Sequence, residues 1–242
     1  MGRATRASPR QTSERPPAFA HVISALRRLY GKPRPAAVTD PLEIILFENI
    51  AYLADDERRE KAFQALKTRV GLSPAKILAA PRSVLREIAS NGIVPDQTVE
   101  KIRSIAAIAV EEFGGSLASV TRLPIPAAKK ALKKFPSIGD PGAEKVLLFS
   151  QSAPILALES NGLRVLLRLG FGTEDKNYAR SYRSAQAAVD AQGKRDCDWL
   201  IEAHQLLRRH GQELCKRSHP SCEICPLRPL CPYAASRAPA ER

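Results

Sequence analysis

The sequence predicts an all-α fold of roughly ten short helices, and three observations support this prediction. Apolar residues recur at spacings of three and four, as in Phe63, Leu66 and Val70, which is the period of a helix with one buried face. No run of alternating β-branched residues is long enough to predict a sheet. Prolines and glycines interrupt the helical pattern at short intervals, at positions 71–74, 81, 91–92, 114–115 and 124–126.

The two ends of the chain lack this pattern. Residues 1–17 are rich in Arg, Ser, Thr and Pro, so we expect a disordered basic tail there, and residues 234–242 are expected to form a second tail. The 242 residues, of which 44% are hydrophobic, are enough for one large domain or two small ones.

The chain is strongly basic. Its 38 Lys and Arg residues exceed its 25 Asp and Glu residues and give a net charge of +13. Such an excess favours a polyanionic partner, because neutralised phosphates release their counterions. Apolar runs such as 105–110 are far shorter than the ~18 residues of a membrane span, and the N-terminus has no apolar signal sequence. We therefore expect a cytoplasmic protein, nucleoid-associated if bacterial, with no membrane partner.

Four of the five cysteines lie close together near the C-terminus. They are separated by six, two and five residues, at Cys215, Cys222, Cys225 and Cys231. Four thiolates at this spacing can surround one metal ion or one 4Fe-4S cluster. Structural zinc is the alternative, but zinc sites usually contain two close cysteine pairs, and here one close pair is flanked by two single cysteines. The spacing therefore favours the iron–sulfur cluster.

Two further residues near this loop have separate interpretations. Arg217 lies between the first two ligands, so we expect it to contact a DNA phosphate. Cys197 lies outside the set of four and is expected to be a small buried side chain.

A second feature lies upstream, in the segment 127–149, AAKKALKKFPSIGDPGAEKVLLF. A lysine-rich helix is expected to end near Lys134, and a tight hairpin follows at 135–139. Asp140 can cap the next helix, with Pro141 at its first position. Backbone amides of such a hairpin form a phosphate site without reading the base sequence, although alone the pattern fits any helix connection. The expected DNA contacts are Lys133, Lys134, Ser137, Ile138, Gly139 and Gly142.

Together these features resemble the endonuclease III and MutY superfamily of DNA glycosylases, over about residues 41–232. The segment RRHGQELCKRSHPSCEICPLRPLC is similar to the family's cluster loop. FPSIGDPGA resembles its Leu-Pro-Gly-Val-Gly hairpin and departs from it at Ser137, where the family usually has Gly. LESNGLRVLLRLG is similar to the segment with the catalytic Asp, and ILFENIAYL to the MutY segment with a catalytic Glu.

The resemblance implies two helical domains, with a helix-hairpin-helix motif and a C-terminal four-cysteine 4Fe-4S loop. A six-helix domain would span 44–154, and the cluster domain would combine 18–43 with 155–233. The active-site cleft would lie between the domains. The implied partner is double-stranded DNA, and we expect a monomer.

The resemblance also places two carboxylates in the site. Glu48 falls on the MutY catalytic Glu, and its apolar neighbours Ile44, Ile45 and Ala51 predict a raised pKa and a role as the acid that protonates the departing base. Glu159 replaces the family's Asp and is expected to stabilise the sugar cation or to position water. The alternatives are an ordinary ion pair of Glu48 with a lysine or arginine, and a helix-capping role for Glu159.

The position of the family's nucleophilic lysine is occupied by Pro141, which has no amine; Lys145 lies one turn later and does not match the motif. We therefore expect a monofunctional glycosylase that hydrolyses the glycosidic bond. A non-catalytic iron–sulfur DNA-binding protein is the first alternative, and a bifunctional glycosylase and lyase is a weaker one.

Three side chains beside these motifs are left with open interpretations. Tyr52 falls where relatives fill the hole left by a flipped base, and it either stacks there or packs in the core. Arg164 and Arg168 are expected to be surface or ion-pair residues.

Overall fold

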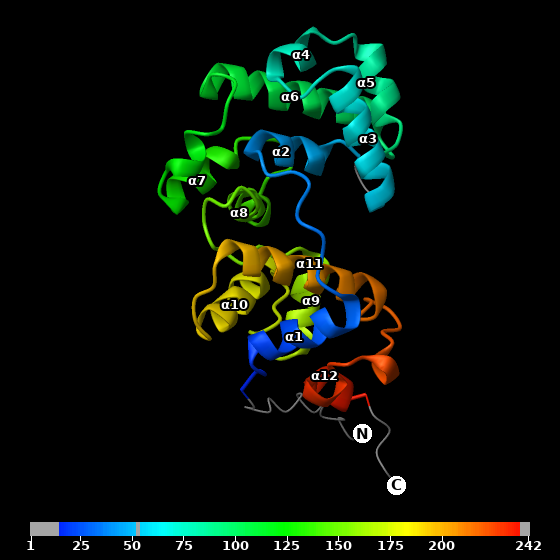
Figure 1. The fold of residues 1–242 in the computed structure, drawn as a ribbon, viewed down its shortest axis with the longest axis vertical. Helices are drawn as coiled ribbons and strands as arrows, with labels where there is room; N and C mark the ends of the chain where they lie inside the picture. The colour runs from blue at the N-terminus through cyan, green and yellow to red at the C-terminus, as the bar shows by residue number, and fades with distance from the viewer. Residues whose placement is uncertain (1–14, 52–53, 238–242) are drawn as a thin grey trace, which may run out of the picture. The chain divides into compact units, whose positions relative to one another are not determined.

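The computed structural model describes residues 15–51 and 54–237 of the chain. Within these ranges all regular structure is helical (Figure 1), so the predicted all-α fold is confirmed. None of the described helices is long and apolar enough to cross a membrane.

The contacts within the chain divide it into two compact units. The described parts of the first unit lie within Met1–Gly31, Ser160–Lys194 and Leu207–Arg242. The second unit consists of Lys32–Glu159 and Arg195–Leu206, so each unit is assembled from segments that are distant in the sequence.

The second unit is built around its longest helix, α6 (Pro95–Phe113), against which α2, α4 and α5 pack. Helix α8 packs against α2 and α7, which brings the predicted hairpin beside α2. Side chains such as Ile45, Leu66 and Ile102 fill the core and are fully buried. The other helices of this unit are α2 (Pro41–Asn49), α3 (Asp56–Arg69), α4 (Pro74–Ala79), α5 (Arg82–Ala89), α7 (Ile125–Leu132) and α8 (Asp140–Phe149).

The first unit packs α9 (Ser160–Arg168) against α10 (Tyr178–Asp190) and α12 (Pro232–Ala235). Its core includes an edge-on contact between Phe19 of α1 (Phe19–Tyr30) and Phe171, with ring centroids 5.7 Å apart. Helix α11 (Cys197–Glu213) contributes residues to both units. The cysteine loop follows α11 and contains two short 3-10 helices, Cys222–Ile224 and Arg228–Leu230.

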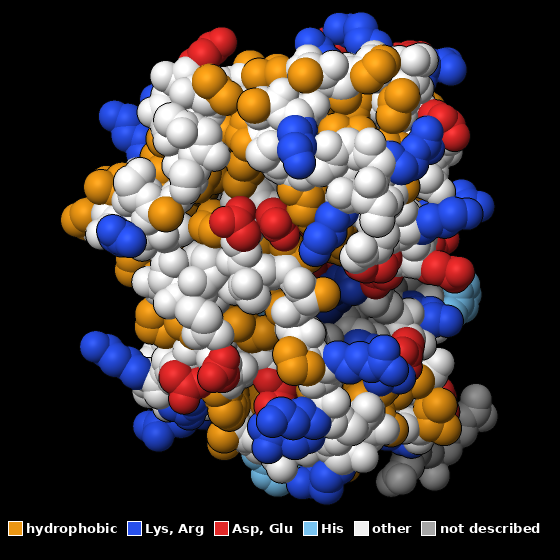
Figure 2. All heavy atoms as spheres, turned by 45° about the horizontal axis from the view of Figure 1, so that its top comes forward, with side chains coloured by type: hydrophobic (Ala, Val, Ile, Leu, Met, Phe, Trp, Pro, Cys, Tyr) orange, Lys and Arg blue, Asp and Glu red, His pale blue; other side chains and the backbone are white. Residues whose placement is uncertain are grey.

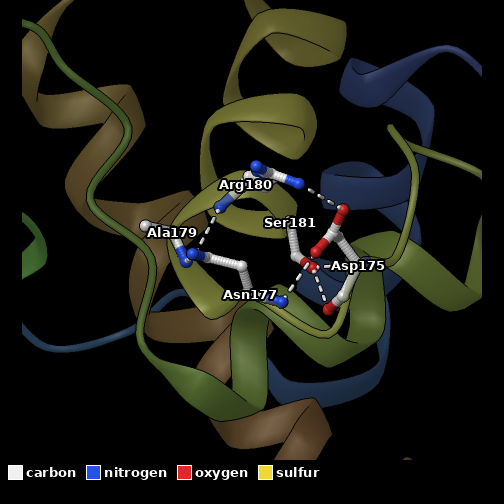
Figure 3. Close-up of polar contacts among 5 residues, drawn as sticks. All are labelled: Asp175, Asn177, Ala179, Arg180 and Ser181. Atoms are coloured by element: carbon white, nitrogen blue, oxygen red, sulfur yellow. Dashed lines mark hydrogen bonds and ion pairs between the residues drawn. The ribbon is translucent and has the colours of Figure 1, made fainter.

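Short polar side chains fix several helix starts, as expected from their capping chemistry. Asp40 accepts hydrogen bonds from the backbone N–H groups of Leu42 and Glu43 and so begins α2. Figure 3 shows the start of α10, where the Asn177 side chain accepts from the N–H groups of Ala179 and Arg180.

The loop before α10 is closed on itself by a second group of polar contacts. The Asp175 N–H donates to the Ser181 hydroxyl over 2.8 Å, and that hydroxyl donates to the Asp175 carbonyl over 3.0 Å (Figure 3). Because backbone and side chain are bonded in both directions, the turn that leads into α10 has a defined shape.

Candidate functional site

Glu48, the first predicted catalytic carboxylate, lies in the last turn of α2 and forms an ion pair with Lys145 of α8. The Lys145 Nζ atom lies 2.7 Å from Glu48 Oε1, and the two side chains keep 22% and 28% of their surface exposed, respectively. A carboxylate at a helix C-terminus faces the negative end of the helix dipole. The ammonium of Lys145 therefore offsets an unfavourable position.

The pKa of Glu48 is shifted in the direction opposite to the one expected from the sequence. Burial raises the pKa of this carboxyl, but the charge and hydrogen bond of Lys145 lower it by more, and the charges of Arg59 and His204 add to the lowering. The net result is a pKa below the ordinary value, so the predicted raised pKa is wrong. Neighbours in the sequence are apolar, whereas the cations come from α3, α8 and α11, which the local sequence does not reveal.

His204 of α11 connects this pair to the segment that precedes Glu159. The side chain is 4% exposed, and its Nδ1 atom lies 2.7 Å from the Ala157 carbonyl oxygen, which can only accept, so Nδ1 carries the proton. The ring also contacts Phe149 edge-on, with centroids 5.1 Å apart. His204 thus holds the chain two residues before Glu159 while its charge acts on Glu48. The motifs gave no signal for it.

Glu159 itself is partly exposed and immediately precedes the first residue of α9. It belongs to the same compact unit as Glu48. Pro141 lies in the first turn of α8, one turn before Lys145.

The predicted hairpin is present between α7 and α8. Ser137 has a φ of 61°, in the left-handed region, which explains why glycine suits this position and why the serine is under local strain. The backbone N–H of Ile138 donates to the Phe135 carbonyl over 3.2 Å. A Cβ atom on Gly142 would lie 3.4 Å from two side-chain atoms of Ile138, so a small residue there allows α8 to approach the hairpin closely.

Asn49 anchors this hairpin to α2 and was not predicted. Its side-chain amide donates to the Pro136 carbonyl over 3.2 Å and to the Ile45 carbonyl over 3.0 Å. The residue is 3% exposed, so both bonds are shielded from water. The position next to Glu48 means that the same turn of α2 holds both the hairpin and the ion pair with Lys145.

The lysines of the hairpin are partly neutralised by acidic side chains. Lys133 lies 3.2 Å from Asp140, and Lys134 pairs with Glu112. The hydrogen bond from Lys133 lowers the pKa of Asp140. Asp140 also differs from its predicted role, because α8 begins at Asp140 itself, Gly139 is the cap residue, and no side-chain capping bond forms. Such exposed pairs are weak, so a phosphate can compete for the lysines.

The basic side chains do not form one continuous patch on the face drawn in Figure 2, where Lys and Arg alternate with Asp and Glu. One local concentration lies in the first unit. There a cavity of about 480 Å³ has Arg164, Arg168, Lys176 and Arg217 among its lining residues. Arg217 is exposed, as a phosphate contact requires. Tyr52 lies outside the described residues.

The four predicted cysteine ligands line one apolar pocket of the first unit, together with leucines such as Leu169, Leu214 and Leu227. Burial raises the pKa values of the Cys225 and Cys231 thiols, and the charges of the other cysteines of the set raise them further. Within 15–51 and 54–237, no group of three or more His, Cys, Asp or Glu side chains is arranged to hold a single metal ion. The donor set, four sulfurs in an apolar pocket, fits a 4Fe-4S cluster.

Two arginines of α9 hold the cysteine loop in place, which the sequence interpretation as surface residues missed. Arg168 donates to the Cys215 sulfur over 3.3 Å and to the carbonyls of Lys216 and Arg217 over 2.8 and 3.2 Å. Arg164 donates to the Cys215 carbonyl over 2.9 Å. Their spacing of four residues on one helix face was the available signal.

A buried histidine, His210, lines the same pocket and contacts the half-buried Tyr30. Burial lowers the pKa of His210 to about 4 and raises the pKa of Tyr30 to about 12, so both are neutral at pH 7. Tyr30 Oη lies 3.1 Å from His210 Nδ1, and His210 Nε2 lies 3.5 Å from the Cys225 sulfur. A neutral imidazole carries one N–H, so His210 donates to one of these two partners and accepts from the other.

Gly211, the residue after His210, allows α11 to approach α9 closely. A Cβ atom there would lie 2.7 Å from both the carbonyl oxygen and the Cβ atom of Asn161, closer than real contacts allow. The two residues of the His-Gly pair before the first cysteine therefore have separate structural roles. His210 contacts Tyr30 and Cys225, and Gly211 leaves room for α9. Cys197 belongs to the second unit, outside the set of four, and it is half-buried rather than buried as expected from the sequence.

The fold and these two sites define an all-helical protein with a helix-hairpin-helix and a four-cysteine pocket. No protein-family model matches the sequence. The chain is 26% identical over 209 residues to endonuclease III of Thermotoga maritima, with 86% of this chain and 91% of the relative covered. It is 26% identical over 165 residues to thymine-DNA glycosylase of Aeropyrum pernix, with 66% of this chain and 69% of the relative covered.

Solved structures show the same fold. A structure of a non-covalent endonuclease III–DNA complex matches with a TM-score of 0.71 and 19% identity, over 90% of this chain and 96% of that chain. A thermostable thymine-DNA glycosylase matches with a TM-score of 0.72 and 18% identity, over 90% and 97%. The chain is thus similar over most of its length to proteins named endonuclease III, and it shares their fold.

Proposed function

We propose that the protein is a monofunctional DNA glycosylase of base excision repair, which hydrolyses the bond between a damaged or mismatched base and its sugar in double-stranded DNA. The observation that carries the proposal is the endonuclease III fold over 90% of the chain with a proline at the position of the family's nucleophilic lysine. Relatives named endonuclease III and thymine-DNA glycosylase support the glycosylase class. We also propose that it acts as a monomer in the cytoplasm, on nucleoid DNA.

The proposed reaction uses a carboxylate at the sugar rather than an amine nucleophile. Breaking the glycosidic bond leaves positive charge on the sugar, which a carboxylate stabilises. We assign this role to Glu159, which also positions the attacking water. Glu48 is an anion at neutral pH because of Lys145, so we assign it a role in holding that lysine in the site rather than the acid role expected from the sequence.

DNA binding is proposed to occur through two surfaces that contact phosphates. The first is the hairpin, with Ser137, Ile138, Gly139 and Gly142 supplying backbone and Lys133 and Lys134 supplying charge. The second is the loop with Arg217. Affinity should fall with salt by a log–log slope of roughly −0.9 for each phosphate contact.

We propose that Cys215, Cys222, Cys225 and Cys231 hold a 4Fe-4S cluster. When bound, the cluster fixes the fold of the loop between them. Anaerobically purified protein should contain about four irons and about four sulfides per chain, which is the composition of one 4Fe-4S cluster. Serine at any of the four positions should abolish iron binding, whereas Cys197→Ser should retain it. Stoichiometric zinc without iron would contradict the assignment.

The test of the function is a screen of duplexes that each carry one deaminated, oxidised, alkylated or mismatched base, with freed bases identified by mass spectrometry. Glu159→Gln should abolish release while duplex binding stays close to that of the parent, because the side chain is not expected to carry binding charge. Glu159→Asp restores the family residue and reports whether the longer side chain is tolerated.

The Glu48–Lys145 pair also favours one other function, a non-catalytic DNA-binding protein on the same scaffold, because a purely structural ion pair has the same geometry. This alternative is adopted if no duplex in the screen loses a base although the protein binds DNA.

A further inference from the structure

Lys145 is the one lysine of α8, and the family motif gives it no role. Its Nζ atom lies 2.7 Å from Glu48, and the ammonium stands 5.6 Å from the centre of the Phe149 ring. The side chain keeps 22% of its surface exposed, so the ammonium is held from two sides and still accessible. Two helices and an aromatic ring therefore position one cation.

A second cation contributes to the surroundings of this pair. The charges of Lys145 and Arg59 both lower the pKa of Glu48, and Arg59 also lies 3.8 Å from Asp56. Arg59 lies on α3, and its buried Nε–H has no hydrogen-bond partner within the part of the chain that the structure describes. Helix α7 also packs against α8, and its Lys129 forms ion pairs with Asp140 and Glu144. An accessible ammonium on Lys145, with a second cation on α3, favours a partner that develops negative charge.

We infer that Lys145 is a catalytic residue of base release and that Glu48 is its positioning residue; this inference rests on the proposed function. As the bond between the sugar C1′ and the base nitrogen breaks, its electron pair leaves on the base. The Lys145 ammonium donates a hydrogen bond to the base as this negative charge develops. Water then adds its oxygen to C1′, and the proton lost from that water ends on the departed base.

The ion pair with Glu48 also excludes a nucleophilic role for Lys145. An ammonium paired with a carboxylate has no free electron pair, so it does not attack C1′ and forms no Schiff base. The lysine acts through its charge and its donor hydrogens. An arginine placed at position 145 keeps both properties, and a methionine of similar length keeps neither.

The experiment compares Lys145→Met, Lys145→Arg and Glu48→Gln with the parent, on duplexes that carry a single uracil, 5-hydroxyuracil, hypoxanthine or mismatched thymine. Freed base is measured in single turnovers with enzyme in excess, and affinity is measured on the same duplexes without the lesion. Lys67→Met, which removes a lysine from the exposed face of α3 in the same unit, is the matched control. Melting temperatures identify any variant that fails to fold.

Lys145→Met should lower the single-turnover rate by about 10²–10³-fold, the range for loss of one preorganised donor, with affinity unchanged. Lys145→Arg should recover most of the rate, Glu48→Gln should fall between these two, and Lys67→Met should match the parent. If Lys145 had only a structural role, its substitution would change the melting temperature, but the reaction rates of the variants would not follow this order. Full activity of folded Lys145→Met, or a borohydride-trapped adduct that Lys145→Arg abolishes, overturns the inference. If the parent itself releases no base, the proposed function fails and the inference fails with it.

Discussion

The cysteine loop depends on one side chain of α9, and removing it gives a measurable prediction. Arg168 makes hydrogen bonds to the Cys215 sulfur and to the carbonyls of Lys216 and Arg217, and its guanidinium stacks 4.2 Å from the centre of the Tyr233 ring. A hydrogen bond to a charged donor contributes about 1.5–3 kcal/mol. Two of the three bonds are exposed, so solvent screening reduces their share.

We therefore expect Arg168→Met to lower the free energy of unfolding by about 2–3 kcal/mol, with the stacking partly retained by the methionine. For a chain of this size the melting temperature should fall by about 4–12 °C. The assay is thermal unfolding of anaerobically purified protein followed by circular dichroism, with iron content measured on the same samples. Iron should fall as well, because the loop that presents Cys215 loses its support.

Arg180→Met is the control for this comparison. Arg180 lies 3.6 Å from Asp175, and 69% of its side chain is exposed, so its loss should cost less than about 0.5 kcal/mol. If Arg168→Met melts at the temperature of the parent and keeps its full iron content, the reasoning about α9 and the cysteine loop is refuted.

Three further predictions concern stability. Gly211→Ala should lower the free energy of unfolding by about 1–3 kcal/mol, because the new methyl group overlaps Asn161; an unchanged urea midpoint would show that α9 and α11 are not in close contact. At position 137 the left-handed backbone should make Ser137→Val less stable than Ser137→Gly by about 1–3 kcal/mol in urea unfolding, and equal midpoints would contradict the strain. The lowered pKa of Glu48 means that its ion pair with Lys145 contributes stability at neutral pH, which is lost as the pH falls through the folded-state pKa. The difference in melting temperature between parent and Glu48→Gln should therefore shrink below about pH 4.5, the unfolded-state range of a glutamate; a difference that grows on acidification would show a raised pKa instead.

Much of the fold followed from the sequence because its signals are local. The three-and-four spacing of apolar residues predicted helices, and Ser137 occupied the position of a family glycine, which the structure explains by its positive φ. The cysteine spacing predicted one pocket, and the four thiols do line one. Each of these inferences depends on a few consecutive residues, so it needs no knowledge of how distant segments meet.

Apart from the capping role of Asp140, the parts that sequence analysis missed depend on distant contacts. The raised pKa expected for Glu48 failed because Lys145 lies 97 residues away in the chain. Asn49 and His204 bond to backbone carbonyls of segments far away in sequence, at Pro136 and Ala157. A local pattern reports the apolar character around a residue but not the charge that the fold brings to it.

The central claim, base release by hydrolysis without attack of an enzyme amine on the sugar, is tested most directly by the state of the DNA after reaction. A duplex labelled at one end, carrying the first base that the screen finds to be released, is incubated with excess protein and divided in two, with alkali added to one half. The account predicts an intact strand without alkali, a single break at the lesion with alkali, and no adduct when borohydride is present. Strand breaks at the lesion before alkali, with a borohydride-trapped protein–DNA complex, would contradict it.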